Sequence, residues 1–281
     1  MTIAVTGASG QLGRLVADRL LATVDPSEVV LLTRDPSKLA DHADRGVTVR
    51  EADFARPEGL AEALDGVERM LVISTDAVGA RVEGHQAAIA AAVTAGVRHV
   101  AYTSIPEPTP DNPAGVVPDH AATEEALRGS GLAWTMLRNN LYSEMQIDTI
   151  RQAAASGRLV TNMGDGAAAY VTRADCAAAA VGVLTGEGHE GQAYDVTGPR
   201  AVTAEDFAAL AERIAGRPIE VQKVDDEAYA AGLVAAGVPE PFVPLIVSFG
   251  AAIRLGKLER VTDVVERIGR RAPTALEDLL A

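Results

Sequence analysis

The sequence predicts an α/β fold in which a doubly wound parallel sheet carries helices on both faces, with a smaller α/β lobe towards the C-terminus. Short β-branched runs alternate with Ala- and Leu-rich segments of helical spacing through the first half of the chain. Strands that alternate with helices are joined by crossovers, which make neighbouring strands parallel. With 281 residues, 48% of them hydrophobic, the chain can also bury a large core.

Six strands are expected in the first half of the chain, with helical segments between them. The expected strands are residues 3–6, 29–33, 47–50, 70–73, 97–103 and 134–137. The expected helical segments are residues 12–21, 36–43, 57–64, 82–95 and 121–127. Gly66, Gly96 and Gly131 follow helical segments, at positions where glycine commonly ends a helix.

Residues 104–118 interrupt this alternation. Five of them are proline, which excludes a regular helix or a central strand. The segment follows the fifth strand, at the carboxyl edge where doubly wound sheets bind their ligands. We expect a loop beside the substrate pocket, and an irregular surface connection is the alternative.

Beyond residue 140 the alternation loosens. Helices are expected at residues 141–155, 173–184, 204–215, 225–236 and 241–255, with strands near residues 159, 194–196 and 219–222. No internal repeat or low-complexity linker sets this half apart. It is therefore expected to pack over one edge of the sheet.

The most specific motif is a G-x-x-G-x-x-G turn directly after the first strand. The first glycine permits a tight exit from the strand, the second lets backbone amides approach a pyrophosphate, and the third lets the helix lie close to the sheet. The negative charge of a pyrophosphate would then meet the N-terminal end of the helix. This turn predicts a bound dinucleotide, held by Gly7, Ser9, Gly10, Gln11, Leu12 and Gly13.

The end of the second strand favours NADP(H) over NAD(H). A fold selective for NAD usually has Asp or Glu at this point, where the carboxylate binds the ribose 2′-hydroxyl. Here Thr33 is followed by Arg34, whose guanidinium can pair with a 2′-phosphate. Asp35 comes next, and a carboxylate here would favour NAD(H). The alternative is that this carboxylate caps the helix that Pro36 opens.

Polar residues after the third and fourth strands complete the expected cofactor site. Asp53 suits a place beside the adenine ring, and Ser74 and Thr75 suit contacts to the ribose on the nicotinamide side. A loop or helix-capping role is the alternative for each. We therefore expect residues 1–140 to form a Rossmann-type NADP-binding domain, with contributions from about residues 160–200. Residues 141–281 form the smaller substrate-side lobe, which is not an independent domain.

Composition excludes several other classes of function. The net charge of −14 and the pI near 4.8 argue against nucleic acid and anionic membranes as partners. Cys176 is the single cysteine, and the five histidines lack the paired spacing of zinc ligands, so no metal site is expected. No apolar run is long enough for a membrane span, and the N-terminus lacks a signal-peptide pattern. A cytoplasmic protein is expected.

The proton relay of ordinary short-chain dehydrogenases is missing. Those enzymes use a Tyr with a Lys four positions later, and none of the five tyrosines here has that neighbour. Interconversion of an alcohol and a ketone needs such a tuned acid. Hydride transfer to a quinone or a cationic dye needs mainly orientation of the two reactants, because the acceptor is already strongly electrophilic.

With these motifs in place, the chain resembles the NmrA-like atypical short-chain dehydrogenases, over nearly its full length. The resemblance rests on TGASGQLG at 6–13, LLTRDPSKL at 31–39, AYTS at 101–104, His120 with Thr123 and Glu124, LRN at 137–139 followed by Tyr142-Ser143-Glu144, TRAD at 172–175, GHEGQAYDVTG at 188–198 and APT at 272–274. It implies an NADPH-dependent reductase that delivers hydride to a quinone or a similar electron-poor small molecule.

The resemblance also implies where the acceptor binds. The nicotinamide and the acceptor would lie near Thr103, Ser104, the proline-rich loop and the segment 138–142, with Asn139, Tyr142 and His120 as candidate catalytic residues. For all three a structural role is the alternative: packing for Tyr142, a core or capping role for His120, and backbone hydrogen bonds for Asn139. Asn140 and Leu141 stand where relatives more often have Gly and Trp, which implies a wider acceptor pocket.

Two other functions stay open at this stage. NmrA-like proteins can hold a dinucleotide as redox sensors and regulate a partner without turnover, and the missing Tyr/Lys pair fits that role equally well. A biosynthetic reductase for a small aromatic metabolite would share the cofactor half and differ in the pocket. A homodimer is the assembly to be tested.

Overall fold

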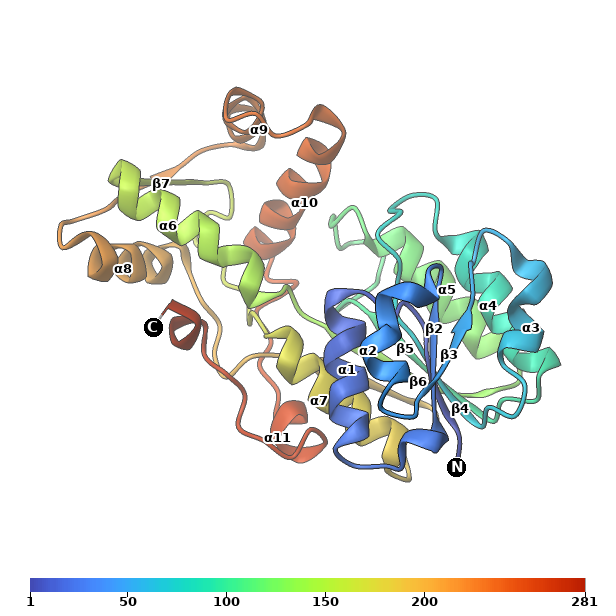
Figure 1. The fold of residues 1–281 in the computed structure, drawn as a ribbon. Helices are drawn as coiled ribbons and strands as arrows, with labels where there is room; N and C mark the ends of the chain where they lie inside the picture. The colour runs from blue at the N-terminus through green and yellow to red at the C-terminus, as the bar shows by residue number, and fades with distance from the viewer. Residues whose placement is uncertain (281) are drawn as a thin grey trace.

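A computed structural model describes residues 1–280 as a seven-stranded sheet with helices on both faces and a smaller lobe beside it (Figure 1). All neighbouring strands are parallel, in the order β3-β2-β1-β4-β5-β6-β8. The order reverses between β1 and β4, which defines a switch point at the carboxyl edge. The predicted fold class is confirmed. The strands are β1 (Ile3–Val5), β2 (Val29–Thr33), β3 (Thr48–Glu51), β4 (Arg69–Val72), β5 (His99–Ser104), β6 (Ala133–Asn139) and β8 (Gln192–Val196).

Each face of the sheet has its own helical layer and its own core. On one face α1 (Gln11–Leu21) packs against α7 (Arg173–Thr185), with α11 (Val264–Arg267) beside α7. On the other face α4 (Val82–Thr94) packs between α3 (Leu60–Ala63) and α5 (Val117–Gly129). Because side chains alternate along a strand, Ile3 and Val5 join the α1–α7 core while Ala4 joins the α3–α5 core. The short helix α2 (Ala40–Ala43) lies against β3.

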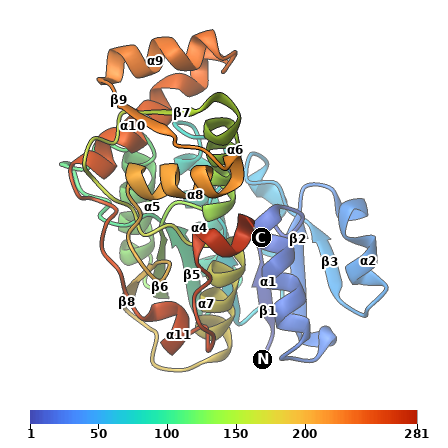
Figure 2. The same cartoon turned by 90° about the vertical axis from the view of Figure 1, so that its left-hand side faces the viewer.

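The smaller lobe gathers at one end of the sheet, as the rotated view in Figure 2 shows. It has a separate core that includes Ile150, Leu159 and Phe207. Within residues 1–280 no helix is long and apolar enough to cross a membrane. The elements of the lobe are α6 (Ile147–Ser156), β7 (Arg158–Thr161), α8 (Ala204–Ala215), β9 (Glu220–Lys223), α9 (Asp226–Ala235) and α10 (Val243–Arg254), with β7 and β9 paired in parallel.

Several details differ from the expected elements. The helix expected from residue 141 begins at Ile147, after a 3₁₀ helix over Ser143–Gln146. Helix α5 starts at Val117 rather than at residue 121, because Pro118 lies in the first turn, where no intrahelical N–H is needed. The segments that open at Pro36 and Pro57 begin as 3₁₀ helices and continue as the four-residue helices α2 and α3. The short helix α11 and a 3₁₀ helix over Leu276–Leu280 were not predicted.

A buried carboxylate in α7 ties the C-terminal segment to the sheet. Asp175 has no exposed surface, and its Oδ2 accepts hydrogen bonds from the Thr172 hydroxyl and the Thr274 backbone N–H, both at 2.8 Å. Its Oδ1 lies 3.1 Å from Nε of Arg271. The TRAD and APT motifs, far apart in the sequence, therefore meet at one point on the α1–α7 face.

Candidate active site

The glycine turn lies between β1 and α1 in a conformation that other residues do not fit. Gly7 has a φ of 58°, in the left-handed region that favours glycine. A Cβ on Gly13 would lie 2.7 Å from Cα of Ala8, so this helix can approach the turn only with glycine here. Gly10 is the N-cap of α1 and supplies no side-chain acceptor. The first-turn amides of α1, including those of Gln11 and Leu12, are therefore left for an anion.

A pair of hydroxyls joins this turn to the end of β2. Oγ of Ser9 and Oγ1 of Thr33 are 2.9 Å apart. Arg34 follows with an exposed side chain that makes no hydrogen bond or ion pair with another residue in the part of the chain that the structure describes. Its guanidinium is therefore free to meet a ligand.

The carboxylate of Asp35 is bonded within its own turn. It accepts hydrogen bonds from the hydroxyl of Ser37 at 2.6 Å and from its backbone N–H at 3.1 Å, and so caps the 3₁₀ helix that starts at Pro36. The hydroxyl hydrogen bond is the main reason that the pKa of Asp35 lies below its usual value. Asp35, the carboxylate that would favour NAD(H), thus acts as a helix cap.

Asp53 also holds its own loop. Its oxygens accept from the backbone N–H of Ala55 at 3.0 Å and from Nε of Arg56 at 3.1 Å. These two hydrogen bonds, with a smaller contribution from the charge of Arg34, lower the pKa of Asp53. The charge of Arg34 therefore acts on Asp53.

The ends of β4 and β5 bring Ser74 and Thr103 together. The hydroxyl of Thr103 accepts the Ser74 backbone N–H at 2.8 Å and lies 3.3 Å from Oγ of Ser74. Gly7 is adjacent, since a Cβ built on it would lie 3.7 Å from Cβ of Ile73. The switch-point crevice is thus bordered by the glycine turn on one side and by residues 73–75 on the other.

His120 and Ser104 both make side-chain contacts towards α5. His120 is buried under α5, with its Nδ1 2.8 Å from the hydroxyl of Tyr102, and burial holds its pKa well below the usual value. The Ser104 hydroxyl donates to Glu124 at 2.7 Å. Because side chains alternate along β5, Tyr102 and Ser104 both point to α5, and only Thr103 faces the crevice. His120 therefore lies in the core beside Tyr102, which fits the structural alternative given for it.

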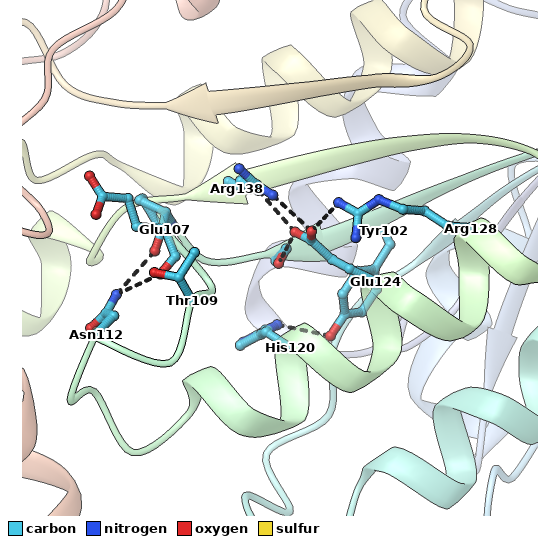
Figure 3. A network of polar contacts seen from close by, with 10 residues as sticks. Tyr102, Glu107, Thr109, Asn112, His120, Glu124, Arg128 and Arg138 are labelled. Atoms are coloured by element: carbon cyan, nitrogen blue, oxygen red, sulfur yellow. Dashed lines mark hydrogen bonds and ion pairs between the residues drawn. The ribbon is translucent and has the colours of Figure 1, made fainter.

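Glu124 is the centre of a charged network between α5 and β6 (Figure 3). Its buried carboxylate accepts from Arg138 at 2.8 and 3.0 Å and from Arg128 at 2.6 Å. Burial alone would raise its pKa, but the hydrogen bonds from Arg138 and Ser104 lead to a net lowering. Glu124 therefore stays ionised and does not supply a proton.

The end of β6 holds buried polar atoms that lack partners. Oδ1 of Asn139 and Oγ of Ser143 are buried, and within residues 1–280 neither has a hydrogen-bond partner. Tyr142 packs under the guanidinium of Arg173, whose Cζ lies 4.4 Å from the ring centroid, and burial raises the pKa of the phenol. Tyr142 is thus a packed aromatic residue, and Asn139 offers an unused acceptor.

The proline-rich loop packs against the smaller lobe. The backbone N–H of Gly115 donates to the hydroxyl of Ser248 on α10 at 2.8 Å. Lys257 pairs with Glu107 at 3.2 Å and with Asp111 at 2.5 Å. Asn112 holds the loop from inside through the carbonyl oxygens of Pro106 and Glu107 (Figure 3). The loop that follows β5 is therefore fixed to α10 and to the segment after it.

These features define a class of protein. A glycine turn with free helix amides, a free arginine after β2 and a crevice at the switch point fit a nicotinamide dinucleotide. The family model described as NAD(P)H-binding matches residues 7–187. The chain belongs to this NAD(P)H-binding family and, within it, to the NmrA-like oxidoreductases. The resemblance predicted from the motifs is confirmed.

Individual relatives match over almost the whole chain. Quinone oxidoreductase 2 of Escherichia coli is 38% identical over 91% of this chain and 89% of its own. The structure of that NADPH-dependent enzyme in complex with NADPH covers 99% of this chain and 98% of its own, at 35% identity and a TM-score of 0.95. Citrobacter sp. triphenylmethane reductase in complex with NADP(H) has 36% identity, the same coverage and a TM-score of 0.92.

Proposed function

We propose that this protein is an NADPH-dependent reductase that transfers hydride to a quinone or a similar electron-poor small molecule. Bound NADPH would supply the hydride. The protein's own residues bind and orient the two reactants. The observation that carries the proposal is the state of the acids near the crevice: His120 is buried with its Nδ1 engaged, and Glu124 is ionised between two arginines. An acceptor that needs little proton transfer suits such a site.

Arg34 is the proposed selector of the phosphorylated cofactor. Its guanidinium is exposed and free among residues 1–280, and the neighbouring carboxylate of Asp35 is occupied by Ser37. A 2′-phosphate would therefore meet a positive charge without competition from that carboxylate. The glycine turn would hold the pyrophosphate, Asp53 would border the adenosine, and Ser74, Thr75 and Thr103 would border the nicotinamide ribose.

Asn139 is the proposed contact to the reacting groups. A buried carbonyl without a partner costs about 1–3 kcal/mol, which a ligand N–H or O–H can recover. The nicotinamide carboxamide and a hydroquinone-like product both carry such donors. We therefore assign Asn139 to orientation of the bound reactants, with Tyr142 as the aromatic surface that packs beside it. Ser104 is not included, because its hydroxyl is used by Glu124.

Steady-state oxidation of NADPH with menadione as the acceptor tests the proposed activity. We expect turnover that depends on both compounds. It is measured as the loss of absorbance of the reduced nicotinamide. If NADPH binds but menadione and a panel of cationic dyes all fail to accelerate its oxidation, the protein is a sensor and the proposal is wrong.

Replacement of Arg34 tests the choice of cofactor. Arg34→Ala should weaken NADPH binding by about 1.5–3 kcal/mol, the size of a lost charge-assisted contact, and should leave NADH binding unchanged. Arg45→Ala is the matched control, since this arginine is also exposed but pairs with Asp18 at 2.8 Å. Equal dissociation constants for NADPH in the wild type and Arg34→Ala would overturn the assignment.

Three finer features belong to the same proposal. We propose that residues 1–140, with α7 and β8, form the dinucleotide-binding unit, and that the rest of the chain forms the acceptor-side lobe. A homodimer is proposed as the assembly, and light scattering would give twice the 29.1 kDa of the chain. A cytoplasmic location is proposed because reduced nicotinamide cofactors are kept inside the cell, and cell fractionation would test it.

A further inference from the structure

The exit of β4 is held by side chains from three other elements. After Val72 the chain leaves the sheet, so the next backbone N–H groups lose their ladder partners and need other acceptors. Three consecutive N–H groups find them in side chains. Ile73 donates to Oγ1 of Thr6 at 3.0 Å, Ser74 to Oγ1 of Thr103 at 2.8 Å, and Thr75 to Nε2 of His85 at 3.2 Å.

The third acceptor is a histidine whose tautomer is fixed by its neighbours. The hydroxyl of Thr123 donates to the carbonyl oxygen of Asp119 at 2.8 Å. It therefore accepts the hydrogen bond from Nδ1 of His85, 3.0 Å away. With the proton on Nδ1, Nε2 is left as an acceptor for the Thr75 N–H. The ring has no exposed surface, and burial, followed by the charge of Arg81, lowers the pKa of His85 to about 4.

The backbone carbonyl oxygen of Thr75 is also bonded to a side chain. Nη1 of Arg81 donates to the carbonyl oxygen of Thr75 at 2.8 Å. Nε of Arg81 donates to Oδ2 of Asp119 at 3.1 Å, and that oxygen also accepts the Gly79 N–H at 2.7 Å. Both backbone polar groups of Thr75 are thus bonded to the start of α4 and, through it, to α5. The backbone at Thr75 is therefore held in one position beside the crevice.

We propose that His85 is a positioning residue for the cofactor, acting through the backbone of Thr75. It rests on the proposed function, because Ser74 and Thr75 border the crevice on the side proposed for the nicotinamide. The neutral imidazole fixes the peptide of Thr75, and Thr103 fixes that of Ser74. This side of the crevice is therefore already shaped before a ligand binds, which lowers the ordering cost of binding.

Binding of two ligands separates the halves of the site. 2′,5′-ADP reaches only the adenosine side, whereas NADPH also fills the nicotinamide side. In His85→Leu we expect the dissociation constant of NADPH to rise about tenfold, the size of one lost hydrogen bond, with that of 2′,5′-ADP unchanged. His85→Gln keeps an acceptor near the position of Nε2 and should restore most of the affinity for NADPH.

His99→Leu is the matched control. This histidine is also buried, and its Nε2 lies 2.8 Å from Oγ1 of Thr135, but it begins β5 at the opposite edge of the sheet. It should lower thermal stability without changing NADPH binding. Hydrogen exchange in residues 73–76 should accelerate in His85→Leu and not in His99→Leu. Should His85→Leu not fold, Thr123→Val replaces it: it removes the group that fixes the tautomer and should also weaken NADPH selectively.

Two results would overturn the proposal. One is an equal affinity for NADPH in the wild type, His85→Leu and His99→Leu; where His85→Leu does not fold, an unchanged affinity in Thr123→Val counts in the same way. The other is an equal loss for NADPH and 2′,5′-ADP, which would mean general damage to the site. Failure of the proposed reductase activity can be told apart from failure of the His85 proposal. In that case the wild type itself would bind NADPH without acceptor-dependent turnover.

Discussion

The two sides of the candidate active site differ in how their polar groups are satisfied. At the ends of β1, β2 and β4 the side chains and backbone amides are bonded to one another, as in the pairs Ser9–Thr33 and Ser74–Thr103. At the end of β6, Oδ1 of Asn139 and Oγ of Ser143 are buried without partners within residues 1–280. On the cofactor side the polar groups left without partners are the first-turn amides of α1 and the exposed guanidinium of Arg34, both suited to an anion. On the acceptor side they are buried, uncharged side-chain oxygens.

This difference matches the two tasks of the site. The nicotinamide dinucleotide is the same molecule in every turnover, so a surface preformed for its bound conformation lowers the ordering cost on the protein side. Acceptors vary, and the unbonded atoms beside Tyr142 can pair with whichever donor a ligand presents. The stability lost at each unsatisfied atom, about 1–3 kcal/mol, is recovered only on binding. The comparison therefore predicts that changes on the two sides affect different measurements.

The largest effect is expected from Gly13→Val on the cofactor side. The new Cβ would overlap backbone atoms of Gly7 and Ala8, which cannot move without opening the turn. We expect the dissociation constant of NADPH to rise at least about a hundredfold, and unfolding free energy to fall by roughly 1–3 kcal/mol. Gly129→Ala is the control, since a Cβ there meets nothing within 4 Å. A Gly13→Val variant that binds NADPH normally would show that α1 need not approach the turn.

A much smaller effect on NADPH binding is expected from Glu124→Leu, which lies behind the acceptor side and should mainly change stability. Arg138 and Arg128 would lose their shared partner, but both guanidiniums reach solvent. We therefore expect unfolding to become easier by about 2–3 kcal/mol, less than for a fully enclosed pair. Chemical denaturation measures this change, and NADPH binding should stay within about threefold. A fall in NADPH affinity as large as that in Gly13→Val would contradict the separation of the two sides.

Asn139→Leu tests the acceptor side directly. Removal of the unsatisfied Oδ1 loses no hydrogen bond, but the hydrogen bond from Asn139 to Tyr142 is lost. We therefore expect protein stability to change by no more than about 1 kcal/mol. We expect kcat/KM for menadione to fall about tenfold, equivalent to about 1.4 kcal/mol, with the dissociation constant of 2′,5′-ADP unchanged. An unaltered kcat/KM would remove Asn139 from the site and leave its unpaired oxygen unexplained.

The smallest effect concerns pH. His85 has a folded pKa of about 4, below its usual 6.5, so the unfolded chain takes up a proton first as the pH falls. Its contribution to stability is present above pH 6.5 and is lost as the pH falls from there towards 4, by about 1 kcal/mol between pH 7 and 5.5. The charged groups that act on the ring are Arg81 and Asp119. Urea denaturation at both pH values should show a smaller decrease for His85→Gln; equal decreases would mean that His85 does not titrate in this way.

Local chemistry made the cofactor side predictable from sequence. The glycine spacing, the strand before it and the helix after it lie within a dozen residues, so one window contains the whole signal. Asp35 followed by Pro36 and Ser37 is likewise a local capping pattern, and the structure has that cap. The six strands of the first half also lie where the β-branched runs predicted them.

The rest depends on contacts between distant segments. His85 acts on Thr75 only because α4 returns to the exit of β4, and its tautomer is set from α5. No short motif records such a contact. His120 and Ser104 were expected near the site because of the family resemblance, which does not show in which direction their side chains point. Alternation along β5 was the available signal, since it separates Thr103 from Tyr102 and Ser104.

The pairing of α1 with α7 has a consequence for how the protein is made. The glycine turn is synthesised well before α7, the helix that covers α1 from Arg173 onwards, and before its anchor residues Arg271 and Thr274. Such distant contacts slow folding, and a nascent chain that stops before α7 would leave Val16 and Leu20 exposed to solvent. The glycine turn is therefore made long before the helix that covers it, so chaperones would meet the unfinished chain with this apolar face uncovered.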